Sequence, residues 1–205
     1  MNNYTMDCYE TKREILNFSK KMTNRLKKRV TKFVIDIQYG LSRGKSCLIS
    51  EIARLLEEKI DLKNTIERLC DNLVGIKDEK KEQIEKNYQN EIKKYFGNEP
   101  IAIFDDSDIA KRYGKKFEDL DDIIDASSEK KEAVKGYHVC EATILGEKEK
   151  QPFSVYSKIY SYKSESFVSM NWYTIESIQT VINVPNRKCN MVFDRRYDDN
   201  KIIEM

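Results

Sequence analysis

The chain has 205 residues, 40% hydrophobic and 35% charged, so it is long enough for two small domains and apolar enough to fold. No apolar run approaches the roughly 18 to 20 residues that span a bilayer, and the N-terminus lacks the apolar stretch of a signal peptide, which favours a cytoplasmic protein without membrane contact. Five cysteines occur without any Cys-x-x-Cys pair, which argues against a disulfide framework and a zinc site.

The net charge of +2 is distributed unevenly. Residues 1–98 hold 21 Lys and Arg against 15 Asp and Glu, whereas residues 99–205 hold 16 against 20. This asymmetry is expected if the first half binds a polyanion and the second gathers carboxylates around a metal. Because Gly97 and Pro100 break the helical pattern, we place the boundary between two domains, 1–98 and 99–205, near residue 98.

Apolar residues at three- and four-residue spacing predict one helix over residues 12–39, ended by Gly40. From Lys12 to Lys32 the other faces of this helix carry nine basic residues and a single acid. The basic run within this stretch is Lys27, Lys28 and Arg29. Each neutralised phosphate releases counterions, so we interpret this surface as a DNA-phosphate contact, with an ordinary solvated helix face as the alternative.

Residues 46–73 predict two short helices with a tight connection, the outline of a helix-turn-helix. The second helix begins after Asp61, a residue type that caps helix N-termini. Its residues expected to face a DNA groove are Lys63, Asn64, Thr65 and Arg68. Any small helical hairpin shares this pattern. A Lys- and Glu-rich helix over 77–96 completes the first half.

Short apolar runs in residues 99–205 predict strands, and two of these strands are followed by an aspartate. Residues 101–104 form a short apolar run followed by Asp105, and residues 191–193 form another, followed by Asp194. The elements expected between them are a helical turn within 117–124, an antiparallel hairpin of residues 137–144 and 153–162, and a helix over 171–183. The single histidine, His138, falls on the first hairpin strand, where a structural role is more common than metal ligation.

A right-handed crossover through the helix would place the last strand parallel to the first and beside it. Neighbouring strands lie about 5 Å apart, so Asp105 and Asp194 could share a divalent cation, or hold two about 3.5 to 4 Å apart. Such a pair suits phosphodiester chemistry, and a pair of structural aspartates is the alternative.

Two segments resemble the catalytic motifs of insertion-sequence DDE transposases, in the branch with a Tyr-Arg-Glu-Lys signature. Residues 101–107 (IAIFDDS) are similar to the first motif, an apolar strand followed by Asp, any residue, then Ser or Thr. Residues 192–197 (VFDRRY) are similar to the second, apolar residues followed by Asp-Arg-Gly and an aromatic. Residues 136–138 and 152–160 also resemble that family, so the likeness covers 100–199 and reaches the first half only as general helical character.

The resemblance implies an α+β protein in which an all-helical N-terminal DNA-binding region precedes an incomplete RNase H-like domain with a mixed sheet. It implies metal ligation by Asp105 and Asp194, with Mg²⁺ or Mn²⁺ as cofactor and Arg195 on a DNA phosphate. Asp106 and Asp108 remain rivals of Asp105 as first ligand. The implied partner is double-stranded DNA at the terminal repeats of the element, with a homo-oligomer left open and a nucleoid-associated location.

The sequence departs from the family pattern at two points. Arg196 stands where the family has glycine, and the chain ends eleven residues after Asp194 without the Tyr-x-x-Arg-x-x-x-Glu motif of the third carboxylate. We therefore expect a truncated transposase that neither cuts nor joins DNA alone. The alternatives are a non-catalytic DNA-binding regulator of transposition and an unrelated helix-turn-helix regulator with an α/β sensor domain.

Overall fold

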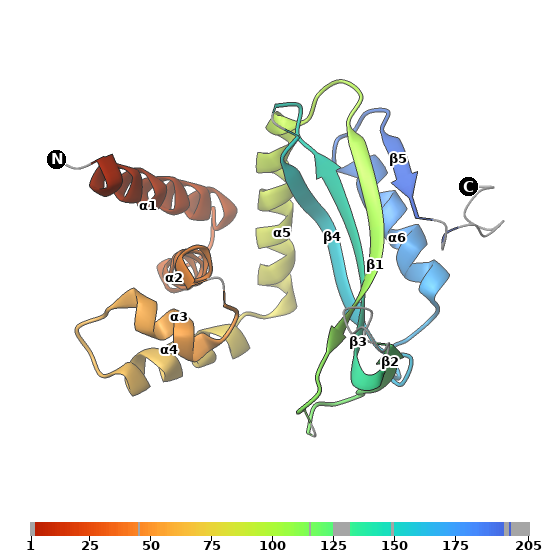
Figure 1. Cartoon of the computed structure of the whole chain (residues 1–205). Helices are drawn as coiled ribbons and strands as arrows, with labels where there is room; N and C mark the ends of the chain where they lie inside the picture. The colour runs from red at the N-terminus through yellow and green to blue at the C-terminus, as the bar shows by residue number, and fades with distance from the viewer. Residues whose placement is uncertain are drawn as a thin grey trace. The chain divides into compact units, whose positions relative to one another are not determined.

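The computed structural model describes residues 3–44, 46–114, 116–124, 132–148, 150–194 and 197, with side chains from Tyr9 onward. The chain forms two compact units, Met1–Glu91 and Ile92–Met205. Helices precede strands and the sheet is mixed, so the expected α+β class is confirmed at this level (Figure 1). No helix within the described ranges has the length and apolar character needed to cross a bilayer.

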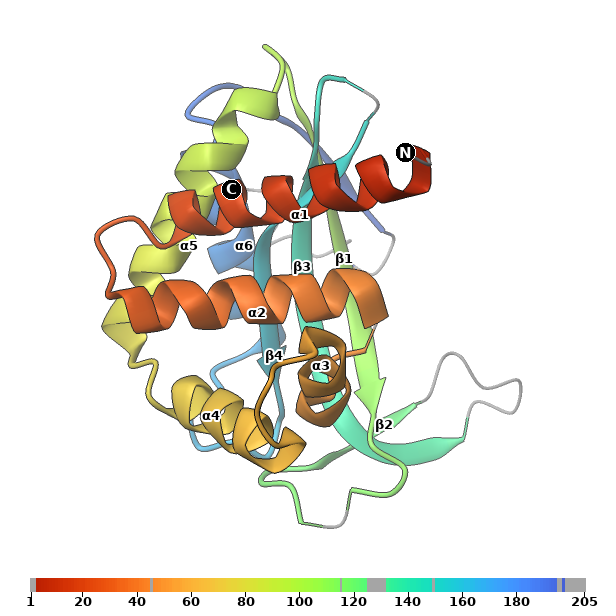
Figure 2. The same cartoon turned by 90° about the vertical axis from the view of Figure 1, so that its left-hand side faces the viewer.

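The first unit, here the helical unit, consists of helices alone. Its elements are α1 (Asn3–Met22), α2 (Lys28–Gly44), α3 (Ile49–Leu56), α4 (Leu62–Val74) and α5 (Asp78–Ile92), the last of which ends at the border of the second unit. Helices α1 and α2 lie side by side, and α3 and α4 follow on the other side of α2 (Figure 2). The two short helices and the Lys- and Glu-rich helix expected from the sequence are all present.

The single helix predicted over residues 12–39 is wrong, because the chain turns between α1 and α2. Arg25 adopts the left-handed conformation, with φ 68°. The side-chain amide of Asn87, on α5, donates to the carbonyls of Met22 (2.8 Å) and Asn24 (3.2 Å). These bonds satisfy one carbonyl at the end of α1 and one in the turn that follows it.

Gly40 does not end α2, which continues to Gly44. Gly40 is buried where α2 crosses α3, and a Cβ atom there would lie 2.5 Å from Cγ2 of Ile52. This glycine therefore permits close helix packing. The buried centre of the helical unit is Phe33, Ile52, Ala53 and Leu69.

The second unit, here the sheet unit, contains a five-stranded sheet. Its elements are the short helix η1 (Lys93–Tyr95), strands β1 (Ile101–Ala110), β2 (Asp121–Ile124), β3 (Ala133–Leu145), β4 (Pro152–Tyr160) and β5 (Asn190–Phe193), and helix α6 (Met170–Asn183). The strand order is β2-β3-β1-β5, with β4 paired to β3. Strand β3 pairs antiparallel with both β1 and β4, while β5 pairs with β1 in parallel.

Two predictions in the sheet unit need correction. The strand after residue 100 does not end before Asp105 but continues to Ala110, because β3 pairs with it as far as Gly136. Residues 121–124 form strand β2 rather than a helical turn, and they pair with the start of β3. An extended partner strand thus decides the backbone conformation where the local sequence pattern was ambiguous.

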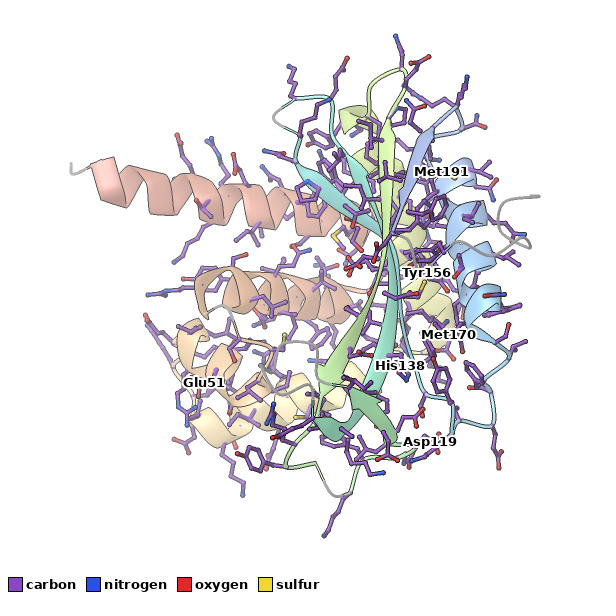
Figure 3. All side chains as sticks on the ribbon, turned by 45° about the vertical axis from the view of Figure 1, so that its right-hand side comes forward. Glu51, Asp119, His138, Tyr156, Met170 and Met191 are labelled. Atoms are coloured by element: carbon purple, nitrogen blue, oxygen red, sulfur yellow. The ribbon has the colours of Figure 1, made fainter. Side chains whose placement is uncertain are left out.

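Helix α6 covers one face of the sheet, against β3 and β4. It begins at Ser169, whose hydroxyl accepts the backbone N–H of Trp172, an N-cap bond. Tyr156 belongs to β4 (Figure 3), and its hydroxyl donates to Glu176 of α6 at 2.6 Å. Since Phe104 and Ala142 are register neighbours and Ala142 pairs with Tyr156, Phe104 also points to the α6 face.

Candidate functional site

Asp105 and Asp194 follow two paired residues on neighbouring parallel strands. The register of β1 and β5 runs to the pair Phe104 and Phe193, whose rings stack with centroids 4.4 Å apart. Asp105 and Asp194 are the next residues on each strand, and both are exposed. The parallel, adjacent arrangement expected of these two strands is therefore present.

The three candidate first ligands divide between the two faces of the sheet. Asp106 and Asp108 share the α6 face with Phe104, because successive strand residues point to opposite sides. Asp105 lies on the other face, beside the partly exposed Ile103 and Val192. Among the three, Asp105 is therefore the one that lies on the face opposite α6.

Glu141 is a carboxylate beside Asp105 that our sequence interpretation missed. It lies on β3 directly across from Asp105 in the antiparallel register. Like charges at opposed positions on one face destabilise a strand pair. Neither carboxylate forms an ion pair with another described residue. The alternating pattern of residues 137–144 could have identified Glu141 only if its register with β1 had been known.

The pair Asp105 and Asp194 is not part of a larger ligand cluster within the part of the chain that the structure describes. No group of three or more His, Cys, Asp or Glu side chains there is arranged to hold a metal. Two carboxylates still match a common mode of Mg²⁺ binding, in which one or two carboxylates act together with substrate phosphates and water.

The helical unit exposes several of the basic side chains predicted to contact DNA. Lys27 and Lys28 are exposed at the start of α2, and Asn64 is exposed on α4. Lys63 is 83% exposed and lies 3.8 Å from Glu67, a contact that solvent screens. These side chains are accessible to a phosphate.

Two other predicted DNA contacts form hydrogen bonds within the helical unit. Arg29 is exposed, but its Nε donates to Oδ1 of Asn72, which joins α2 to α4. Thr65 is buried, and its hydroxyl donates to Glu58 at 3.1 Å. Arg195 lies outside the described residues.

Arg68 belongs to a four-charge network linking α2 and α4 through the turn between α3 and α4. The guanidinium of Arg68 contacts Asp36 at 2.8 Å and Glu58 at 2.9 Å. Lys32 contacts the same two acids at 2.9 Å and 2.8 Å. Hydrogen bonding from Lys32, together with that from Arg68, lowers the pKa of Glu58 to about 2. Each acid thus has two cationic partners.

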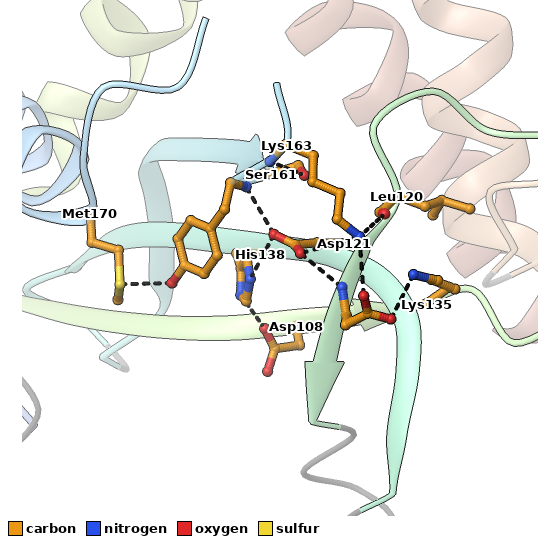
Figure 4. Close-up of polar contacts among 10 residues, drawn as sticks. Asp108, Leu120, Asp121, Lys135, His138, Ser161, Lys163 and Met170 are labelled. Atoms are coloured by element: carbon orange, nitrogen blue, oxygen red, sulfur yellow. Dashed lines mark hydrogen bonds and ion pairs between the residues drawn. The ribbon is translucent and has the colours of Figure 1, made fainter. Parts of the chain in front are cut away.

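His138 lies at the centre of a second polar cluster, at the β2 end of the sheet (Figure 4). Its Nδ1 atom is 2.8 Å from Oδ1 of Asp108, and its Nε2 atom is 3.8 Å from Oδ2 of Asp121. The backbone N–H of Tyr162 donates to the same Asp121 oxygen at 2.9 Å. The structural role expected for His138 is consistent with these contacts, which join β1, β2 and β3 to the segment after β4.

Lysines flank this cluster on its outer side. Lys135 lies 2.6 Å from Asp122, and Lys163 lies 3.1 Å from it. The Lys135 ammonium, with that of Lys163, lowers the pKa of Asp122. A pocket of about 450 Å³ opens beside the cluster.

The comparisons with known proteins give no further constraint on either cluster. No protein-family model matches the chain, and no curated protein matches it.

Proposed function

We propose that the sheet unit is an RNase H-like core of the DDE transposase type, in which Asp105 and Asp194 bind a divalent cation that contacts DNA phosphate. The observation that carries this proposal is the position of the two aspartates, each directly after one of the paired residues Phe104 and Phe193. Helix α6 returns the chain so that β5 runs parallel to β1, as the resemblance requires.

The opposed carboxylates of Asp105 and Glu141 add support. Two negative charges across a strand pair cost stability unless a cation reduces their repulsion. Mg²⁺ or Mn²⁺ at this position would polarise a phosphodiester and lower the pKa of a bound water. Asp105 and Asp194 would hold the cation, and Glu141 would increase the negative potential that attracts it.

We expect the purified chain to bind Mn²⁺ without nicking DNA, because the described residues include no group of three or more His, Cys, Asp or Glu side chains arranged to hold a metal. Paramagnetic Mn²⁺ broadens NMR signals of nearby nuclei, so the amides after Phe104 and Phe193 should broaden first. Asp105→Asn and Asp194→Asn should each weaken Mn²⁺ binding by about tenfold, the equivalent of roughly 1.4 kcal/mol.

The matched control is Asp108→Asn, in the same strand but on the opposite face of the sheet. It should leave the broadening near Asp105 unchanged. If Asp108→Asn removes Mn²⁺ binding and Asp105→Asn does not, the cation belongs on the α6 face and the proposal fails. Metal-dependent nicking that Asp105→Ala abolishes would keep the site and contradict the expected inactivity.

We further propose that the helical unit binds double-stranded DNA through its exposed basic side chains. Lys27, Lys28 and Lys63 would contact phosphates. Arg68 would act indirectly, since its guanidinium bridges Asp36 and Glu58 and so fixes α4 relative to α2. This binding alone would suffice for the second candidate function, a non-catalytic regulator that occupies the element ends.

Salt dependence tests this proposal. The logarithm of DNA affinity should fall steeply with the logarithm of salt concentration, and Lys27→Ala and Lys28→Ala should each reduce that slope by about 1. Lys148→Ala, at an exposed lysine of the sheet unit, is the control and should leave the slope unchanged. An affinity independent of salt between about 50 and 200 mM would exclude phosphate contact by this surface.

A further inference from the structure

We propose that the pocket at the β2 end of the sheet binds a guanidinium group. The pocket measures about 450 Å³. Its lining comprises acidic, aromatic and apolar side chains, among them Asp106, Asp108, His138, Tyr160, Tyr162 and Met170. It opens on the α6 face of the sheet, opposite to Asp105, so this site goes beyond the proposed metal centre and does not depend on it.

The carboxylates of the pocket favour a cationic ligand. Asp108 is engaged through Oδ1 alone, by His138, among the residues that the structure describes, which leaves Oδ2 for a ligand. Asp106 lies two residues earlier on the same face. Asp122 also lines the pocket, where Lys135 and Lys163 offset its charge.

The aromatic side chains favour a planar cation. The ring of His138 lies 4.4 Å from that of Tyr162 and 5.4 Å from that of Tyr160, centroid to centroid. Cations are attracted to aromatic faces, and the flat guanidinium also stacks on them, which a tetrahedral ammonium cannot do. Tyr162, which is 44% exposed and lines the pocket together with Asp108, therefore offers a ring on which a guanidinium would stack.

His138 holds in place the carboxylate that would bind the ligand. Its Nδ1 atom lies 2.8 Å from Oδ1 of Asp108, and its Nε2 atom is buried, 3.8 Å from Oδ2 of Asp121. Guanidinium carries five N–H donors and no acceptor, which matches the carboxylate oxygens of the pocket.

The volume indicates the size of the ligand. Ligand pockets span about 300 to 1,000 Å³, so about 450 Å³ suits one small guanidine compound or one arginine side chain. The same chemistry could come from either source. Agmatine represents the free compound, and N-acetyl-arginine methylamide represents an arginine within a peptide.

The chain contains one histidine, so the imidazole of His138 is an unambiguous NMR reporter inside the pocket. Titration of the full chain with agmatine to about 10 mM should shift the His138 ring signals with saturation. Butylurea, a planar but neutral analogue, should produce no saturable shift. A stronger response to the arginine methylamide than to agmatine would assign the site to a peptide side chain, and the reverse would assign it to a small molecule.

Asp108→Asn should weaken agmatine binding by about tenfold or more, since hydrogen bonds to charged groups are stronger than those between neutral groups. Tyr162→Leu should weaken it through loss of stacking, while the backbone bond to Asp121 remains. Glu147→Gln, at an exposed acid outside the pocket, should have no effect. Equal responses to agmatine and butylurea, or full binding by folded Asp108→Asn, would overturn the proposal.

Discussion

Acidic side chains in the helical unit have cationic neighbours, whereas Asp105 in the sheet unit has another acidic side chain as its neighbour. In the helical unit, Asp36 and Glu58 each contact both Lys32 and Arg68. On the face of the sheet opposite α6, Asp105 lies across from Glu141, so carboxylate faces carboxylate. Pairs of opposite charge hold the helices in place. Two like charges that face each other across a strand pair cost stability, and they are tolerated where a function requires them.

The largest effect should come from removing one member of the matched network. Arg68→Met would leave Asp36, whose side chain is 11% exposed, and Glu58 with Lys32 alone. An uncompensated buried charge costs about 3 to 5 kcal/mol, and partial solvent access here reduces the expected loss to about 2 to 3 kcal/mol. Native-state hydrogen exchange of α2 and α4 amides would measure the loss.

The control for this variant is Arg54→Met. Arg54 pairs with Glu51 at 2.8 Å, but both side chains are about half exposed. Its loss should change stability by less than about 0.5 kcal/mol. Equal effects of the two substitutions would mean that the four-charge network contributes no more than a surface ion pair. The claim that paired charges stabilise the helical unit would then fail.

The network also shows what the sequence could and could not predict. The apolar spacing that predicted α3 and α4 depends on neighbours three and four residues apart, so it is visible locally. The pairing of Asp36 with Arg68 joins residues 32 positions apart, which no local pattern records. For the same reason the turn after α1 was missed, because Asn87, 65 positions from Met22, satisfies its carbonyls.

The sheet follows the same rule. The pattern of residues 171–193 predicted α6, β5 and the parallel return to β1, because the helix between the strands is itself a local signal. The polar residues 105–108 suggest that the strand ends before them. Pairing with β3 nevertheless extends β1 through these residues. The pocket around His138 was not predicted, since its Asp108 partner is 30 positions away.

Acid should weaken the helical unit through Glu58. Hydrogen bonding from Lys32 holds its folded pKa at about 2, against an ordinary value of 4.5. The unfolded chain therefore binds a proton first as pH falls, so the stabilisation is complete above about pH 4.5 and is lost as pH falls from 4.5 towards 2. Allowing for solvent screening, this amounts to about 1 to 2 kcal/mol.

Denaturation of the helical unit at several pH values would measure this dependence. Glu58→Gln should be less stable at neutral pH and should lose most of the slope between pH 4.5 and 2. A slope unchanged by Glu58→Gln would assign the acid sensitivity to other carboxylates. Acid sensitivity confined to the sheet unit would contradict the contrast drawn between the two units.

The smallest effect should have the opposite sign and belongs to the sheet unit. Without divalent cations, Asp105→Asn removes a like-charge pair with Glu141 and should stabilise the sheet unit by about 0.2 to 1 kcal/mol. The single tryptophan, Trp172, lies on α6, so its fluorescence during urea unfolding reports this unit. With Mg²⁺ present the wild-type chain should become the more stable of the two, because a cation bound only by the folded state stabilises the wild-type chain more than the variant that binds it more weakly. If Asp105→Asn instead destabilises the metal-free chain, then Asp105 has a structural partner, and the opposed carboxylates no longer mark a site.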